Sequence, residues 1–158
     1  MKNVIVVFLV LMTLQVSAQG KKWVELFDGK SLNNWKINES PASFRVENGS
    51  IIIEGPRGHL FYDGSVGDHN FKDFEVQATV MTFPGSNSGL YVCTDFLPVG
   101  FPSVGYEVQV NNSHTDWRRT ASLYGIVDTA EKLVHDEEWF ELYVKVEGNH
   151  ITTKINGR

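Results

Sequence analysis

The chain has 158 residues, of which 42% are hydrophobic and 12% aromatic, and it carries a formal net charge of -5 at pH 7. This composition indicates one globular domain with a substantial core and excludes a disordered chain. A mildly acidic chain without a Lys/Arg-rich run also argues against nucleic acid as a partner.

The first residues of the chain read MKNVIVVFLVLMTLQVSAQG. Lys2 precedes an apolar run from Val4 to Leu14, and Val16-Ser17-Ala18 places small residues where signal peptidase cleaves. We therefore expect a signal peptide over residues 1–18, a mature domain over 19–158 and a periplasmic or secreted protein. The apolar run is too short to span a bilayer, so no stable membrane span is expected after cleavage.

Short apolar runs that alternate with polar residues fill the rest of the chain, and Gly, Asn, Asp and Pro separate them. Alternation of this kind is typical of strands with one buried face. The expected strands cover 44–47, 50–54, 74–81, 90–93, 105–112, 121–127, 140–147 and 150–155, with Asn48-Gly49 as a hairpin turn. Many short strands without a long helical period predict an all-β antiparallel sandwich or jelly roll.

Two further expectations concern the core and the end of the chain. Trp23, Trp35 and Trp139 lie beside apolar runs, which favours a buried position for all three. Asn156-Gly157 predicts a hairpin turn, but no return strand follows it. We therefore expect a domain that is truncated at its C-terminus and has an open sheet edge.

The stretch GYEVQVNN, residues 105–112, places Glu107, Gln109 and Asn111 on the strand face opposite the valines. Alternate residues lie roughly 6.5–7 Å apart, so this polar row is about 13 Å long, the length of one or two sugar rings. Carboxylates and amides suit sugar hydroxyls, which both donate and accept hydrogen bonds. An incidental polar face on a solvent-exposed strand explains the same pattern equally well.

Neighbouring segments contain the other candidate site residues. Tyr91 and Tyr124 belong either to the same polar face or to the packed interior. Asn87 either binds substrate or caps a loop. His114 and Trp117 lie in a loop at the expected sheet rim, where functional residues are common, although an ordinary loop position explains them too.

Glu107 has no second carboxylate on its own strand, because the next position of the row is Gln109. A glycosidase that uses two carboxylates would need another acid from elsewhere in the chain, with Glu75, Asp95 and Asp116 as candidates. The pattern therefore favours chemistry that needs a single base. The histidines show no ligand spacing and Cys93 is the only cysteine, so local spacing supports neither a metal site nor a disulfide within the chain and leaves the cofactor open.

These motifs together resemble the 3-keto-disaccharide hydrolase domain family, long known as a domain of unknown function. Leu26–Trp35 (LFDGKSLNNW) is similar to the opening LFDGKSLDGW of that family. Asn87–Tyr91 is similar to its NSGI-aromatic motif, and Gly105–Val110 (GYEVQV) is the strongest element. With Thr120–Gly125 as the counterpart of TGxxYG, the resemblance covers nearly all of residues 23–158.

The resemblance implies a concanavalin-A-like jelly roll of two stacked antiparallel sheets, one of them concave and sugar-facing. It also implies cleavage of disaccharides and glycosides oxidised at carbon 3, where the ketone acidifies the hydrogen on carbon 2. One general base removes that hydrogen, and the enolate expels the group on carbon 1 by elimination or on the way to hydrolysis. By position, the resemblance places Glu107 and Gln109 on the concave strand, with Asn87, Tyr91 and Tyr124 as neighbours. Together with the residue patterns above, this gives Glu107, Tyr91 and Tyr124 as catalytic candidates and Gln109, Asn111, Asn87, His114 and Trp117 as substrate-binding candidates.

The chain also departs from the family pattern at three positions. Cys93 stands where Arg is common, Asn111 replaces the Asp of EVQxD, and Ala121 replaces the Gly of TGxxYG. The loss of a cation and a carboxylate from one surface favours a competing interpretation, a carbohydrate-binding module without catalysis. A structural β-sandwich without affinity for glycans is the third interpretation.

Overall fold

The computed structural model describes residues 22–158, so the predicted signal peptide lies outside the described residues. The elements are, in chain order, β1 (Trp35–Ile37), η1 (Pro41–Ser43), β2 (Phe44–Glu47), β3 (Ser50–Ile53), β4 (Leu60–Tyr62), η2 (Val66–His69), β5 (Phe74–Val80), β6 (Ser88–Val92), β7 (Tyr106–Val110), β8 (Phe140–Glu147) and β9 (His150–Ile155). The strand pairs are antiparallel, and η1 and η2 are short 3-10 turns, which confirms the predicted all-β class. Over this range no helix is long and apolar enough to cross a membrane.

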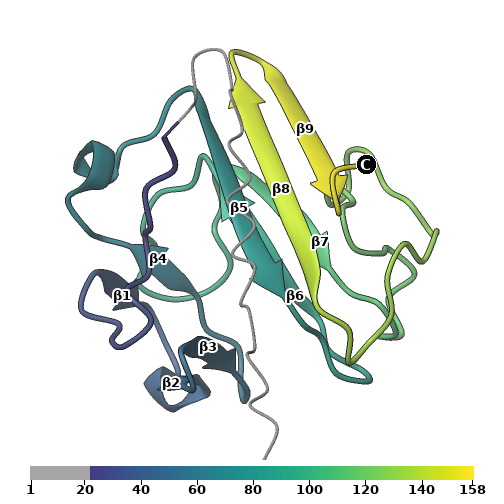
Figure 1. The fold of residues 1–158 in the computed structure, drawn as a ribbon, viewed down its shortest axis with the longest axis horizontal. Coiled ribbons are helices and arrows are strands. Elements are labelled where there is room, and N and C mark those ends of the chain that lie inside the picture. Colours follow the sequence, from purple (N-terminus) through teal and green to yellow (C-terminus); the bar gives the residue numbers. More distant parts are fainter. Residues whose placement is uncertain (1–21) are drawn as a thin grey trace, which may run out of the picture.

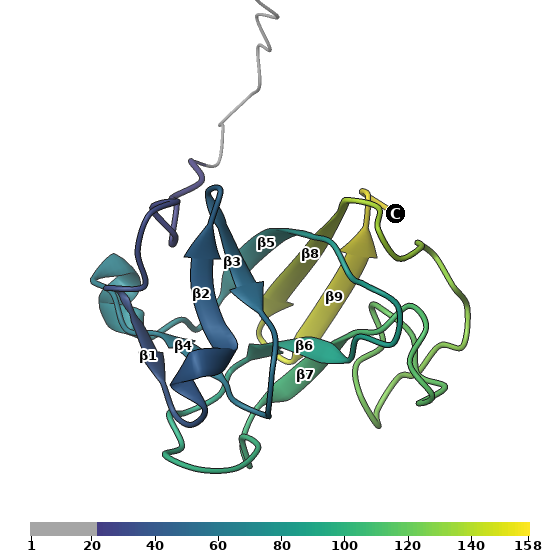
Figure 2. The same cartoon turned by 90° about the horizontal axis from the view of Figure 1, so that it is seen from below.

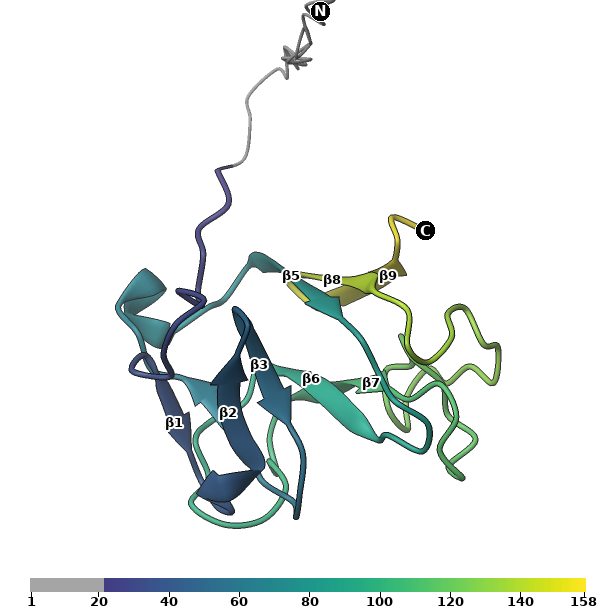
Figure 3. The same cartoon turned by 60° about the horizontal axis from the view of Figure 1, so that its bottom comes forward.

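The strands pair in four separate ladders, β5-β8-β9, β6-β7, β2-β3 and β1-β4. The β5-β8-β9 sheet forms one layer and the β6-β7 pair lies beneath it, as seen edge-on in Figure 3. The β1-β4 and β2-β3 pairs stand together on one side of these two layers (Figures 1 and 2). The resemblance implies two stacked sheets, whereas the hydrogen-bonded strands form four separate ladders.

The core fills the space between the β5-β8-β9 sheet and the β6-β7 pair. Leu142 and Val144 of β8 and Val108 of β7 are completely buried there. Each such side chain stabilises the fold by about 1.5–3 kcal/mol relative to exposure. The buried cluster consists of Val92, Val108, Val110, Val134, Phe140, Leu142, Val144, Val146 and Ile155. Because side chains alternate along a strand, burial of these residues sends the neighbours of Val108 to the opposite face of β7.

The hairpin predicted at Asn48-Gly49 is present between β2 and β3. Asn48 and Gly49 have φ values of 50° and 78°, the left-handed backbone that a tight two-residue hairpin turn requires at both positions. The predicted strands at 74–81, 140–147 and 150–155 likewise appear, as β5, β8 and β9.

Residues 121–127, in contrast, do not form the regular strand that the sequence predicts. The N–H groups of Ile126 and Val127 both donate to the carbonyl of Leu123, at 2.9 Å. Gly125 has a φ of 71°. The segment therefore turns back on itself and contributes only isolated bridges.

The prediction of three buried tryptophans is wrong for two of them, because Trp23 and Trp139 are exposed. Trp139 immediately precedes Phe140, which points into the core, so strand alternation turns the indole outward. Trp23 lies in a segment without regular secondary structure. Trp35 is half-buried and makes an edge contact with Tyr62, with 5.3 Å between the ring centroids.

Candidate functional site

Tyr91 and Glu107 form the centre of the candidate site. They are direct partners in the β6-β7 register, and both belong to the face opposite the core, because the neighbouring Val92 and Val108 are buried. The Tyr91 hydroxyl donates a hydrogen bond to Oε2 of Glu107 at 2.8 Å. Two candidates chosen from the sequence are thus in direct contact, on adjacent strands.

Two neighbours fix the position of the Glu107 side chain. Gly89, on β6, leaves room for it, since a Cβ added there would lie 2.6 Å from Cγ of Glu107. One end of the Gln109 amide faces two acceptors, the Ser88 carbonyl at 2.9 Å and Oε1 of Glu107 at 3.2 Å, so its NH2 group belongs there. The other end of the amide lies 3.0 Å from Oδ1 of Asn87. Gln109 is buried, and its amide therefore positions the carboxylate.

The surroundings shift the acidity of both central groups. Burial raises the pKa of Glu107, the hydrogen bond from Tyr91 lowers it, and the charge of Asp116 raises it further. Burial also raises the pKa of Tyr91, and the hydrogen bond to Glu107 adds to the effect. Glu107 is therefore a stronger base than an ordinary glutamate, while the Tyr91 hydroxyl keeps its proton.

A second acid lies close enough for its charge to act on Glu107. Asp116 accepts a hydrogen bond from the Tyr124 hydroxyl at 3.2 Å. The Arg118 backbone N–H, at 2.9 Å, lowers the pKa of Asp116 most and keeps it ionised. The Arg118 guanidinium lies over the rings of Tyr124 and Trp117, with centroid distances of 4.5 and 5.1 Å. The loop after β7, residues 111–120, thus presents charged and aromatic side chains to the site.

Backbone hydrogen bonds along β7 place Tyr124 beside Glu107. Its N–H donates to the carbonyl of Glu107 at 2.9 Å, and the Gln109 N–H donates to the carbonyl of Ser122 at the same distance. The segment around residue 122 therefore runs along the edge of β7 that β6 leaves free. This pairing places Tyr124 next to Glu107 in space, although 17 positions separate them in the chain.

Asn111 is completely buried and holds the same loop. Its Nδ2 group donates to the carbonyls of Asp116 and Arg118, at 3.0 and 2.7 Å. Its Oδ1 accepts the N–H of His114 at 2.9 Å and a guanidinium N–H of Arg119 at 3.2 Å. Each donor and acceptor of the amide is engaged within the protein, so Asn111 positions the loop and has no free group for a ligand.

His114 also contributes to the loop geometry. Its Nδ1 accepts the backbone N–H of Asp116 at 3.1 Å. Trp117 is exposed beside it and remains open to a ligand. Of the eight candidates, the structure joins Asn87, Gln109, Glu107 and Tyr91 in one cluster and sets Tyr124 and Trp117 beside Asp116, while Asn111 and His114 support the loop.

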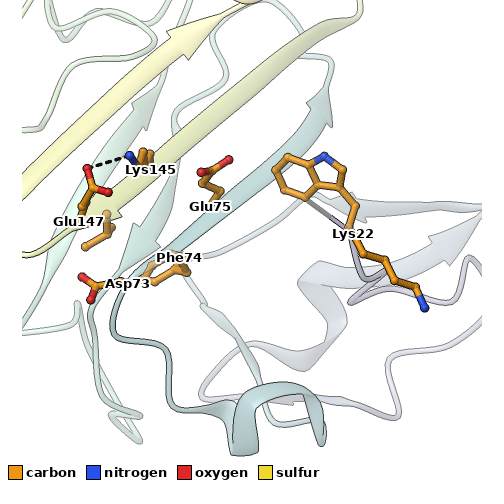
Figure 4. A pocket seen from close by; sticks show the side chains of 8 residues that line it. Lys22, Asp73, Phe74, Glu75, Lys145 and Glu147 are labelled. Atoms are coloured by element: carbon orange, nitrogen blue, oxygen red, sulfur yellow. Dashed lines mark hydrogen bonds and ion pairs between the residues drawn. The ribbon is translucent and has the colours of Figure 1, made fainter. Parts of the chain in front are cut away.

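Across residues 22–158, no three His, Cys, Asp or Glu side chains lie together in a way that would hold a metal ion. A hollow of about 370 Å³ on the far side of the core is separate from the site. Its floor is the outer face of β5 and β8, where Lys145 and Glu147 form an ion pair at 2.7 Å near Glu75 and Asp73 (Figure 4).

Comparison with known proteins gives the family. The sequence profile of 3-keto-alpha-glucoside-1,2-lyase-like domains matches residues 22–158. The chain belongs to this family. The resemblance inferred from the motifs is thereby confirmed.

Two relatives of this lyase-like domain extend the comparison. A 3-keto-disaccharide hydrolase of Bacteroides thetaiotaomicron is 28% identical, over 73% of this chain and 49% of the relative, so the chain spans about half the length of that protein. A crystal structure from Parabacteroides distasonis, provisionally described as a glycosyl hydrolase, superimposes with a TM-score of 0.71 at 22% identity. The superposition covers 84% of this chain and 67% of the Parabacteroides chain, and it shows that the two proteins share a fold.

The sequence reasoning identified one residue of the site only in part and missed another. Asp116 was one of three candidate second acids, and nothing in its local pattern distinguished it from Glu75 and Asp95. His59 lies just before β4, and its ring makes an edge contact with Tyr91 at a centroid distance of 5.3 Å. The contact joins segments 32 positions apart, and a lone histidine before a short strand carries no local signal of it.

The raised pKa of Glu107 makes the stability of this lyase-like domain depend on pH. A carboxyl group whose pKa is raised on folding favours the folded state at low pH, and this contribution is lost as the pH rises through the folded pKa. Relative to Glu107→Gln, the wild type should therefore lose stability as the pH rises from about 4 toward 8. Urea denaturation of both proteins across this range measures the difference, and parallel curves would contradict the pKa shift.

Proposed function

We propose that the protein cleaves glycosides whose sugar ring is oxidised at carbon 3, after export to the periplasm or the outside. The observation that carries this proposal is the Tyr91–Glu107 pair, a half-buried carboxylate of raised pKa on the sheet face opposite the core. Membership of the family and the name of the relative from Bacteroides support the same class of substrate.

The first chemical step is removal of a proton from carbon 2 by Glu107. The electrons of the C2–H bond form the enolate of the C3 ketone, and the proton stays on the Glu107 carboxyl. The enolate then breaks the C1–O bond and forms the C1–C2 double bond, and the leaving oxygen takes the proton held by Glu107, which releases an alcohol and restores the carboxylate. For net hydrolysis, water then adds across the C1–C2 double bond, with its hydroxyl on C1 and its proton on C2. For elimination, the unsaturated ketone is the product.

The two tyrosines have different parts in this step. Tyr91 already donates to Glu107 and so holds the carboxylate in place. Tyr124 is exposed, and its hydroxyl can turn from Asp116 to donate to an oxygen of the substrate. Donors aimed at developing negative charge are often the largest contribution to catalysis. Trp117 offers an apolar ring face to the C–H groups of the sugar, and Asn87 offers an amide to its hydroxyls.

The test is product analysis after incubation with a 3-keto disaccharide and with its unoxidised parent, each with and without chelator. We expect an unsaturated ketone or a 3-keto monosaccharide, together with the released sugar, from the oxidised substrate alone. Binding of both disaccharides without products would instead select the carbohydrate-binding module. Absence of binding would select the structural β-sandwich.

Substitution of Gly89 tests the position of the base. In Gly89→Ala the new methyl group would lie 2.6 Å from Cγ of Glu107, so the Glu107 side chain must move to another rotamer. We expect a folded protein whose kcat is at least about tenfold lower, because a base displaced by 1 Å loses its alignment. The control is Ser88→Ala, on the same strand as Gly89. Another glycine, Gly85, is unsuitable as a control because its φ of 80° would strain an alanine. Unchanged kcat in Gly89→Ala would show that the observed place of Glu107 does not matter.

A further inference from the structure

Four rings next to the Tyr91–Glu107 pair form a continuous surface, here called the aromatic wall: His59, Phe61, Phe96 and Phe101. The His59 ring contacts Phe101 edge-on at 5.4 Å between centroids and lies 6.3 Å from Phe61. Phe61 contacts Phe96 edge-on at 5.1 Å. The wall joins β4 and the segment before it to the β6-β7 connection, residues 93–105, which are distant parts of the sequence.

The aromatic wall is continuous with the candidate site. His59 contacts Phe101 on one side and the Tyr91 ring on the other, at 5.4 and 5.3 Å. The Tyr91 hydroxyl binds Glu107. A substituent on carbon 1 of a sugar whose carbon 2 lies at Glu107 would therefore be within reach of the wall.

Hydrogen bonds and cation–π contacts hold the connection 93–105 in place. The Asn38 amide donates to the Gly100 carbonyl at 3.3 Å, and the Gly100 N–H donates to Oε1 of Glu39 at the same distance. Arg57 forms an ion pair with Glu39 at 2.7 Å and lies over the Phe101 ring at 5.0 Å. The surface is thus formed before any ligand arrives, which lowers the entropy cost of binding.

The exposed side chains of the aromatic wall are apolar, and two cations, Arg57 and Lys36, lie over the Phe101 and Phe96 rings. Phe101 is 60% and Phe96 38% exposed, and Val99 and Val104 of the same connection are exposed as well. Contiguous exposed apolar area of this kind marks a binding surface. Three polar groups beside it are engaged within the protein: Oδ1 of Asn38 accepts the N–H of His59 at 2.8 Å, Glu39 binds Arg57 and Gly100, and the Lys36 ammonium lies over the Phe96 ring at 3.8 Å from its centroid. A second sugar would need free donors and acceptors here, whereas an apolar ring needs none.

We propose that the aromatic wall binds the leaving group of the substrate and that this group is an aromatic or other apolar aglycone, not a second sugar. The inference rests on the proposed function, because the wall matters for turnover only if Glu107 acts on carbon 2 of the glycone. It identifies the leaving group of the substrate, which the catalytic residues alone do not determine. The substrate class is then a 3-keto-glucoside of a phenol or a similar apolar alcohol.

The experiment compares Phe101→Ala with Phe83→Ala, because Phe83 is also 60% exposed but lies in the turn between β5 and β6. The substrates are phenyl and methyl 3-keto-α-glucoside. Phe101→Ala should lower kcat/KM for the phenyl substrate about tenfold or more and for the methyl substrate less than about twofold. Phe83→Ala should change neither. An equal loss on both substrates, or none on either, would overturn the proposal, as would faster wild-type turnover of a 3-keto disaccharide than of the phenyl substrate.

A binding measurement separates failure of this inference from failure of the proposed function. The affinities of unoxidised phenyl and methyl α-glucoside are measured by ligand-observed NMR, which needs no turnover. We expect the phenyl compound to bind about tenfold more tightly, with the preference lost in Phe101→Ala and kept in Phe83→Ala. If no 3-keto-glycoside is cleaved but this preference holds, only the catalytic proposal fails. If cleavage occurs without the preference, only the aglycone assignment fails.

Discussion

Glu107→Gln should reduce kcat on a 3-keto-glycoside by about 10²–10⁴-fold, the typical contribution of a positioned general base. The substitution keeps the shape of the side chain and its contacts with Tyr91 and Gln109, but the amide cannot take a proton from carbon 2. KM should change little, because Asn87, Tyr124 and Trp117 remain in place. Steady-state kinetics with circular dichroism as a check on folding measure both quantities.

The control for this substitution is Glu131→Gln, which removes an exposed carboxylate from the loop between β7 and β8. It should leave kcat within about twofold of the wild type. A Glu107→Gln protein that retains full turnover would refute the role of the carboxylate as the base. A fall in turnover in both variants would point to the overall charge of the protein and not to proton transfer.

Asn111→Ala should destabilise the protein by about 2–4 kcal/mol, the second large effect that we expect. The buried amide makes two hydrogen bonds to the carbonyls of Asp116 and Arg118 and accepts two more. Its removal takes these hydrogen bonds from the Arg118 carbonyl and the His114 N–H, while the Arg119 guanidinium still donates to the Asp116 carbonyl. Because the same loop carries Asp116 and Trp117, turnover should fall as well. Urea denaturation gives the free energy of unfolding.

Two companion variants make the expectation about Asn111 specific. Asn70→Ala changes an exposed asparagine in the connection before β5 and should alter the free energy of unfolding by less than about 0.5 kcal/mol. Asn111→Asp should also destabilise the protein, because a carboxylate cannot donate to the two carbonyls that the amide holds. An Asn111→Asp protein as stable as the wild type would show that the loop is held by other contacts.

Patterns local in the sequence predicted much of the fold. Alternation placed Val108 and Val110 in the core and the residues between them on the other face, because side chains of a strand point to opposite sides in turn. Asn48-Gly49 predicted its hairpin, since these two residue types accept left-handed backbone. Ala121, which stands in place of the Gly of TGxxYG, has a φ of 76°, a left-handed backbone that glycine adopts without strain.

The same local reasoning predicted the central pair of the site but not its surroundings. Glu107 and Tyr91 were chosen from two separate motifs, and strand pairing places them in contact. The three-residue polar row did not remain a continuous surface, because the loop after β7 covers Asn111 and uses its amide. Residues 121–127 turned where their alternation predicted a strand, since Gly125 and the carbonyl of Leu123 close a tight turn.

The sequence by itself thus determined the class of fold, the family, and the face of β7 that carries the acid. Only the tertiary structure decided which distant residues complete the site. Asp116 reaches it through a loop fastened by Asn111, and His59 reaches it through the packing of its ring against Tyr91. Periodicity along one strand shows which side a residue faces, but what covers that side depends on how loops from remote segments fold back, and no local pattern contains that information.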